Sequence, residues 1–143
     1  MKKRGQLNIS FGMIFSIILV IVFLAAGFYA IAKFIDMQKE IQIRSFVSDL
    51  QEDVDTLWKN MQGSQSKEYV LPTKITAVCF VSGEKTYNME FISENIFPRE
   101  IIENIDIGKI TEEESPFCIE NVEGKINLII SKKFGETLVT ITK

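Results

Sequence analysis

The feature that most constrains this chain is residues 11–35, a stretch that is apolar almost throughout. Lys33, near its end, is the only charged side chain in it. A helix of about 20 apolar residues suffices to cross a bilayer, and a lysine near the end of such a helix can extend its ammonium group to the lipid headgroups. We therefore expect residues 8–35 to form a transmembrane helix.

Basic residues precede this segment and acidic residues follow it. The short leader, residues 1–7, holds Lys2, Lys3 and Arg4 and no acid, which by the positive-inside rule places it in the cytoplasm. All 19 acidic residues follow position 35, whereas four of the 16 basic residues precede it, so the exported part has a net charge of −7. Because nucleic-acid binding depends on neutralising phosphates with Lys and Arg, we expect no nucleic-acid partner.

The chain contains no histidine. This excludes Ser-His and Cys-His catalysis and histidine zinc sites, and no other nucleophile motif is present. Three consecutive acids, Glu112, Glu113 and Glu114, lack the ligand spacing of a calcium loop, so we interpret them as a solvated loop. The sequence predicts a protein that is not an enzyme, with no catalytic, cofactor or metal site.

The leader carries a recognisable junction. Residues 2–6, Lys-Lys-Arg-Gly-Gln, directly before an apolar helix, resemble the class III signal of type IV pilin-like proteins, especially the archaeal branch. In that family a membrane peptidase cuts after the glycine on the cytoplasmic side and leaves the helix on the mature chain. The resemblance implies a prepilin peptidase-like enzyme as a partner and a cut between Gly5 and Gln6. Ser10 stands where many family members have a glutamate.

Two other interpretations of the N-terminus remain open. In the first, the segment is an uncleaved signal anchor that carries a chance Arg-Gly-Gln sequence. In the second, it is a secretory signal cut after Ala32, because residues 30–32 show a small-x-small pattern. The apolar run is longer than the roughly 7 to 15 residues of a signal-peptide core, which favours a spanning helix.

Residues 36–62 turn polar but keep a helical stripe of apolar side chains. The stripe comprises Ile43, Val47, Leu50, Val54, Leu57 and Met61, widened by Phe46 and Trp58. No proline or glycine lies between Gly27 and Gly63, so we expect an amphipathic helix that continues the anchor and ends at Gly63.

Two interpretations of this stripe compete. Its breadth favours packing on the chain's own C-terminal domain, through Phe46, Leu50, Val54 and Trp58. The alternative is a coiled-coil seam, although such a seam is narrower and lasts longer. The opposite face is interpreted as solvated; it bears Asp49, Glu52, Asp53, Asp55 and Lys59.

From residue 67 to residue 143 the pattern becomes alternating, as in β-strands. The expected strands are residues 74–81, 86–92, 117–122, 125–131 and 137–142, with one short helix over residues 98–104 and a loop over 111–116. The fold class is therefore α+β: a long N-terminal helix, membrane-spanning in its first half and amphipathic in its second, packed on a small antiparallel sheet. This architecture is similar to the pilin fold.

The two cysteines, Cys79 and Cys118, fall in different expected strands on the exported side. An oxidising compartment allows a structural disulfide between them, and we prefer this to two buried free thiols.

Together these features predict a single-pass membrane protein with its sheet domain outside the cell. Its expected role is that of a pilin-like structural subunit or accessory component of a surface filament, with membrane lipid and copies of itself or other pilin-like subunits as partners. The alternative is a permanently anchored extracytoplasmic binding module that does not polymerise.

Overall fold

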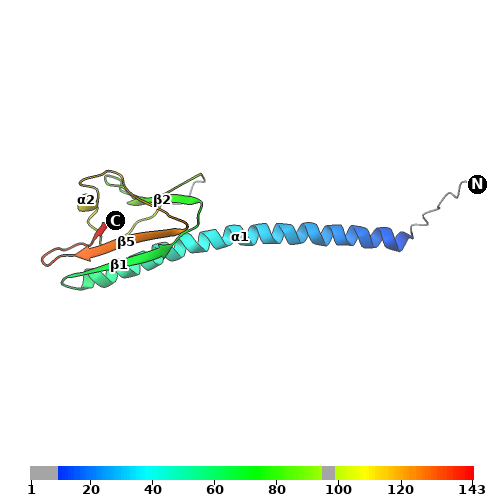
Figure 1. Ribbon diagram of the computed structural model, residues 1–143, viewed down its shortest axis with the longest axis horizontal. Coiled ribbons are helices and arrows are strands. Elements are labelled where there is room, and N and C mark those ends of the chain that lie inside the picture. Colours follow the sequence, from blue (N-terminus) through cyan, green and yellow to red (C-terminus); the bar gives the residue numbers. More distant parts are fainter. Residues whose placement is uncertain (1–9, 95–98) are drawn as a thin grey trace, which may run out of the picture. The chain divides into compact units, whose positions relative to one another are not determined.

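The computed structural model describes residues 10–94 and 99–143. It divides into two compact units, Met1–Gln38 and Lys39–Lys143. The division falls inside helix α1 (Phe11–Lys59), so the second half of this helix belongs to the same unit as the strands (Figure 1).

Helix α1 ends at Lys59, three residues before the expected end. The backbone oxygens of Trp58 and Asn60 accept hydrogen bonds from the Lys132 ammonium, at 2.7 and 2.9 Å. Because terminal carbonyls of a helix need such partners, Lys132 satisfies this end and the chain is free to turn into a strand at Gly63.

Within residues 10–94 and 99–143, six strands form two antiparallel three-stranded sheets, ordered β1-β5-β6 and β3-β2-β4. The strands are β1 (Gly63–Val70), β2 (Ile75–Phe80), β3 (Met89–Ser93), β4 (Phe117–Glu120), β5 (Lys125–Lys132) and β6 (Thr140–Thr142). All five expected strands are present, although most are shorter than expected. The fold class, a long helix on small antiparallel sheets, is confirmed, but there are two sheets and not one, because β4 and β5 pair with different partners.

Strand β1 was not expected from the sequence. Its residues are mostly polar, and Tyr69 is its only buried side chain. The strand forms because it pairs with β5 along its whole length, from Gly63 opposite Lys132 to Val70 opposite Lys125. A Cβ atom on Gly63 would lie 2.7 Å from Leu57 Cδ2, so glycine allows β1 to start this close to the helix.

The sequence predicted a helix over residues 98–104. Residues 99–104, the part of it that the structure describes, are not helical, so this prediction is wrong. This segment is held away from helical geometry by the side chain of Asn88, which donates to the oxygen of Ile102 and accepts from its nitrogen, both at 2.8 Å. A short helix, α2 (Ile107–Ile110), follows instead, with the Asp106 carboxylate accepting from the Lys109 nitrogen at 3.1 Å. The loop at residues 111–116 is as expected.

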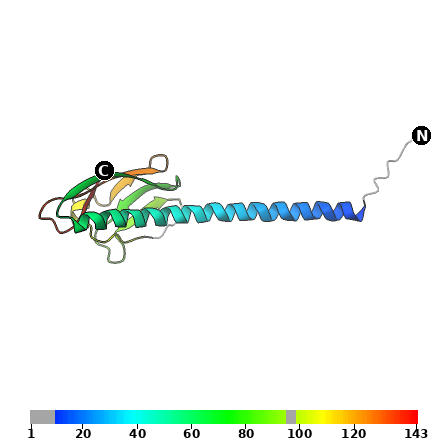
Figure 2. The same cartoon turned by 90° about the horizontal axis from the view of Figure 1, so that it is seen from below.

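The core of the folded unit is built on the second half of α1, which crosses the strands in Figure 2. Phe46, Leu50 and Val54 are at most 2% exposed and belong to one cluster with buried residues from both sheets. The Phe46 ring meets Tyr69 of β1 edge-on at 5.4 Å and Phe91 of β3 at 6.0 Å, measured between ring centroids. One helix side chain therefore contacts both sheets.

Trp58 does not join this core. It remains 41% exposed, so the expectation that it packs with Phe46, Leu50 and Val54 is wrong. Leu57 takes the core position in the last helical turn, and successive helix residues point about 100° apart. The next side chain, Trp58, therefore faces outward.

The expected disulfide is confirmed. Cys79 of β2 and Cys118 of β4 lie directly opposite each other in the strand pair and are bonded, with a sequence separation of 39. The bond joins the two strands that flank the long connection through β3 and α2.

A fragment of residues 37–143 tests the helix packing. We expect a folded monomer in which Leu50→Ala lowers the free energy of unfolding by about 2–5 kcal/mol, because the truncation leaves a core cavity. Ile41→Ala, at an exposed position of the same helix, should change it by less than about 0.5 kcal/mol. Denaturant unfolding measures both. A fragment that dimerises through the helix, while residues 63–143 fold equally well alone, would show that the stripe is a coiled-coil seam.

Removal of the disulfide provides a second test. Closing a loop of this length should stabilise the fold by about 4 kcal/mol in the chain-entropy model, so the double variant Cys79→Ala, Cys118→Ala should unfold at a clearly lower denaturant concentration. Non-reducing peptide mapping of the parent protein should recover the two cysteines in one linked peptide pair. Free alkylation of both thiols in the unreduced, denatured protein would contradict the bond.

Candidate functional site

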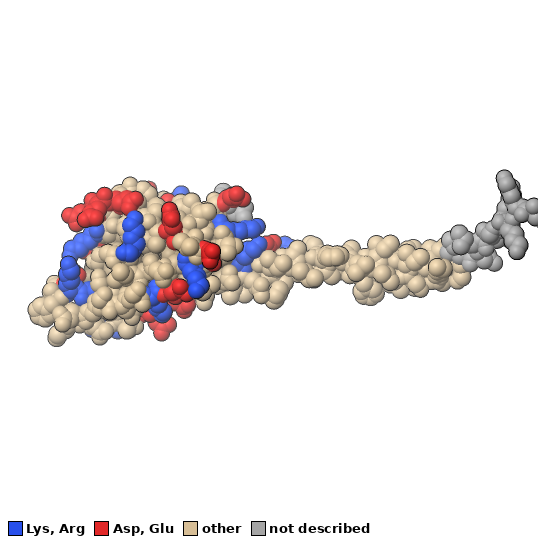
Figure 3. Space-filling view, viewed as in Figure 1, with Lys and Arg blue, Asp and Glu red and all other residues tan. Residues whose placement is uncertain are grey.

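The first candidate site is the apolar half of α1. From Phe11 to Ala32 the helix has no charged side chain, and every described residue of this stretch is exposed. In Figure 3 the side chains visible along it are uncharged. The helix is long and apolar enough to cross a membrane. A surface of this kind is costly to expose to water.

Charged residues begin where this stretch ends. Lys33, Asp36, Lys39, Glu40 and Arg44 follow within the next turns of the helix, and Arg44 donates to the Glu40 carboxylate at 2.8 Å on the solvent side. The leader residues Gly5 and Gln6 lie outside the described residues. The cytoplasmic position of the N-terminus and the cut between these two residues therefore stay predictions.

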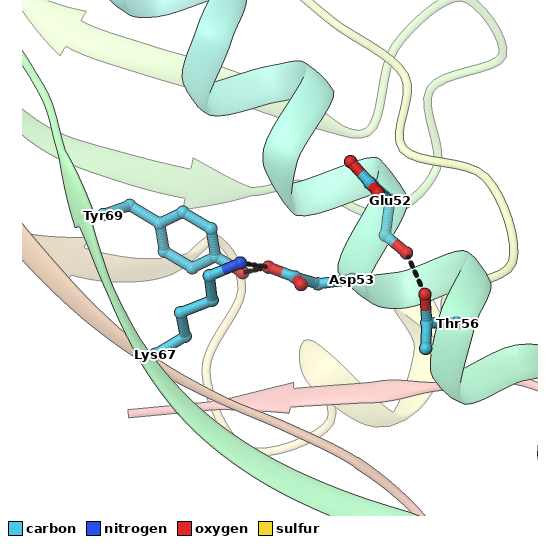
Figure 4. Close-up of polar contacts among 5 residues, drawn as sticks. All are labelled: Glu52, Asp53, Thr56, Lys67 and Tyr69. Atoms are coloured by element: carbon cyan, nitrogen blue, oxygen red, sulfur yellow. Dashed lines mark hydrogen bonds and ion pairs between the residues drawn. The ribbon is translucent and has the colours of Figure 1, made fainter.

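The second candidate site is a polar joint between α1 and β1, drawn in Figure 4. One carboxylate oxygen of Asp53 accepts hydrogen bonds from the Lys67 ammonium and the Tyr69 hydroxyl, both at 2.6 Å. Tyr69 is only 4% exposed, whereas Lys67 reaches the carboxylate from the surface. Beside this contact, the Thr56 hydroxyl donates to the backbone oxygen of Glu52 at 2.8 Å within the helix.

The protonation of this joint follows from its surroundings. Burial, followed by the hydrogen bond to Asp53, raises the pKa of the Tyr69 hydroxyl well above its usual range. The hydrogen bond to Asp53 likewise raises the pKa of Lys67. Both groups therefore hold their protons at neutral pH. In this state both groups donate to the Asp53 carboxylate and link α1 to β1.

A second set of contacts joins α1 to the loop before α2. The Gln51 side chain accepts from the Glu103 nitrogen at 2.8 Å, and the Asp55 carboxylate accepts from the side-chain amides of Gln51 and Asn104, both at 2.9 Å. Asn104 has a left-handed backbone conformation, with φ of 63°, which asparagine tolerates better than most residues. The polar side of the helix thus positions the loop.

These contacts correct the interpretation of the polar helix face. Asp53 and Asp55 were expected to be solvated, but both are partly buried and hydrogen-bonded. The sequence held one indication of this: Asp53 follows Phe46 by seven residues and Leu50 by three, so it lies on the edge of the apolar stripe. Glu52 is exposed, as expected.

The described residues contain no group of three or more His, Cys, Asp or Glu side chains arranged to hold a metal ion. The three glutamates at 112–114 are exposed, and Glu114 pairs with Lys143 at 3.2 Å.

Comparison with protein-family models, with curated proteins and with solved structures finds no match to this chain.

The Tyr69 contact makes stability depend on pH in the alkaline range. Unfolded tyrosine loses its proton near pH 10, whereas folded Tyr69 keeps it, so the folded state binds more protons and its stability falls as pH rises above about 10. Lys67 acts in the same direction. We expect Tyr69→Phe to show a shallower loss of stability than the parent protein when urea unfolding is followed from about pH 8 to 11. Equal slopes for Tyr69→Phe and the parent protein would contradict the assignment.

Proposed function

We propose that the protein is a non-enzymatic, pilin-like structural subunit or accessory component of a type IV pilus-like filament at the cell surface. It is anchored in the membrane by α1 before assembly, with the N-terminus in the cytoplasm and the β-sheets outside. Its partners are membrane lipid, a prepilin peptidase-like enzyme and, through the apolar helix, copies of itself or other pilin-like subunits.

The observation that carries this proposal is the difference in exposure between the two parts of α1. Its first part exposes apolar side chains at every described position, while the stripe centred on Phe46, Leu50 and Val54 in its second part forms the core of a folded unit. An anchor that stays on the mature protein accounts for both halves.

The leader supports the same class of protein. Residues 2–6 match the basic-Gly-Gln junction at which pilin-like chains are cut, and a cut there would leave the whole apolar helix on the mature chain. In a filament, the apolar helices would leave the lipid and bundle, so that helix-helix contacts replace lipid contacts. Small residues such as Gly12 and Ser16 allow helices to approach closely.

One observation favours the alternative, a permanently anchored binding module that does not polymerise. The first turn of α1 contains no acidic residue, and Ser10 stands where many pilin-like chains have a glutamate. The Ser10 backbone oxygen accepts from the nitrogens of Met13 and Ile14, at 2.9 and 3.3 Å. This position therefore starts the helix but offers no carboxylate to a neighbouring subunit.

The mass of the native protein tests the processing step. In a host that carries a prepilin peptidase, we expect loss of residues 1–5 and a mature chain that starts at Gln6. Gly5→Leu should block the cut, because a bulky side chain hinders entry of the extended chain into the peptidase site. Gly12→Ala is the matched control and should be processed normally.

The outcomes separate the candidate functions. A mature chain that starts at Gln6 and appears in sheared surface filaments supports the subunit, whereas a processed chain found only in the membrane fraction favours the binding module. A chain that keeps Met1 is a plain signal anchor, and one that starts at Lys33 is a secreted protein; either result overturns the proposal.

A further inference from the structure

Three large apolar side chains are exposed where α1 ends and β1 begins. Trp58 is 41% exposed, Met61 80% and Phe134 78%. Single exposed apolar residues are common on protein surfaces, but a group of them at one place indicates an interaction site. These three residues are called the apolar tip below.

The fold brings the members of the apolar tip together. Gly63 of β1 pairs with Lys132 of β5, so the segment just before β1, which holds Met61, and the turn just after β5, which holds Phe134, start from neighbouring positions. The Lys132 ammonium also binds the backbone oxygen of Trp58. Figures 1 and 2 agree that the end of α1, the start of β1 and the turn after β5 lie at the same end of the folded unit.

The charges around the apolar tip are positive. Lys59 and Lys133 flank it with exposed side chains, and Lys133 interacts electrostatically with the nearby Glu136 carboxylate. The turn after β5 holds one carboxylate, that of Glu136. It accepts hydrogen bonds from the Lys109 ammonium at 2.6 Å and from the Lys133 backbone nitrogen at 3.0 Å. The extremity that holds the α1–β1 turn is free of acidic side chains in the view of Figure 3, although the exported part of the chain is acidic overall.

The size and chemistry of this surface point to a lipid surface as its occupant. A stable protein dimer covers about 800 Å² on each partner. The three side chains of the apolar tip provide less area than this. Shallow insertion of tryptophan, phenylalanine and methionine between headgroups requires less area, and lysines beside them attract anionic headgroups.

We propose that the apolar tip is a second membrane-contact site, distinct from the apolar half of α1, which inserts Trp58, Met61 and Phe134 into an anionic bilayer with Lys59 and Lys133 at the headgroups. The buried Lys132 holds the two chain segments together so that they enter as one unit. This proposal does not require filament formation and is independent of how the leader is processed.

Trp58, the only tryptophan, is a built-in probe for the test. The full chain is held in nanodiscs of zwitterionic lipid, and phosphatidylglycerol vesicles with brominated acyl chains are added. We expect quenching and a blue shift of the Trp58 emission, because bromine quenches tryptophan only when the two are close. Zwitterionic brominated vesicles should quench much less at the same lipid concentration.

Variants separate the apolar and the charge contributions. Met61→Asp with Phe134→Asp should abolish the quenching. Lys59→Gln and Lys133→Gln, both at exposed positions, should each weaken vesicle binding about fivefold. Val122→Asp and Lys85→Gln are the matched controls, at exposed positions outside the apolar tip, and should bind like the parent protein.

Three results would overturn the proposal. The first is an absence of quenching by anionic vesicles. The second is equal quenching in the Met61→Asp, Phe134→Asp variant and in the Val122→Asp control. The third is self-association that the apolar-tip substitutions abolish while vesicles leave Trp58 unquenched, which would identify a second copy of the chain as the occupant.

Discussion

The folded unit depends on burial of one face of α1. Two sheets of three short strands do not bury enough apolar surface on their own, and both use the same helix to complete their core. Phe46 shows this most directly, because its ring contacts Tyr69 of one sheet and Phe91 of the other. Leu50 and Val54 continue the contact along the helix with no exposed surface. Without this stripe, each sheet would expose its inner face to water.

Polar contacts fix the helix on the sheets without leaving the groups involved unpaired. Asp53 binds Lys67 and Tyr69 of β1, and Lys132 of β5 binds carbonyls at the end of the helix. Buried polar groups are costly unless they are hydrogen-bonded, and here each replaces its lost water with a specific protein partner. The hydrophobic stripe supplies the driving force, and these contacts define how the helix lies on the strands.

The two halves of α1 belong to one continuous helix but differ in which faces are apolar. The first half exposes uncharged, mostly apolar side chains on all sides, which water disfavours but lipid or a bundle of apolar helices would accept. The second half needs only one apolar face because its other face meets water. This division favours a protein whose anchor remains part of the mature chain. The disulfide between Cys79 and Cys118 fits the oxidising compartment that the proposed orientation provides.

Local patterns in the sequence determined the long helix, its apolar first half, the stripe at Phe46, Leu50 and Val54, and five of the six strands. These features are periodic, so they can be read from neighbours along the chain. Only the tertiary structure decided the remainder: that β1 is a strand, that Asp53 is bonded and partly buried, and that Trp58 faces outward. The first two depend on a partner farther along the sequence, since β1 forms by pairing with β5 and Asp53 is covered by β1. Trp58 faces outward because Leu57, its neighbour on the helix, takes the core position. Residues that show no periodic signal of their own take their structure from such contacts.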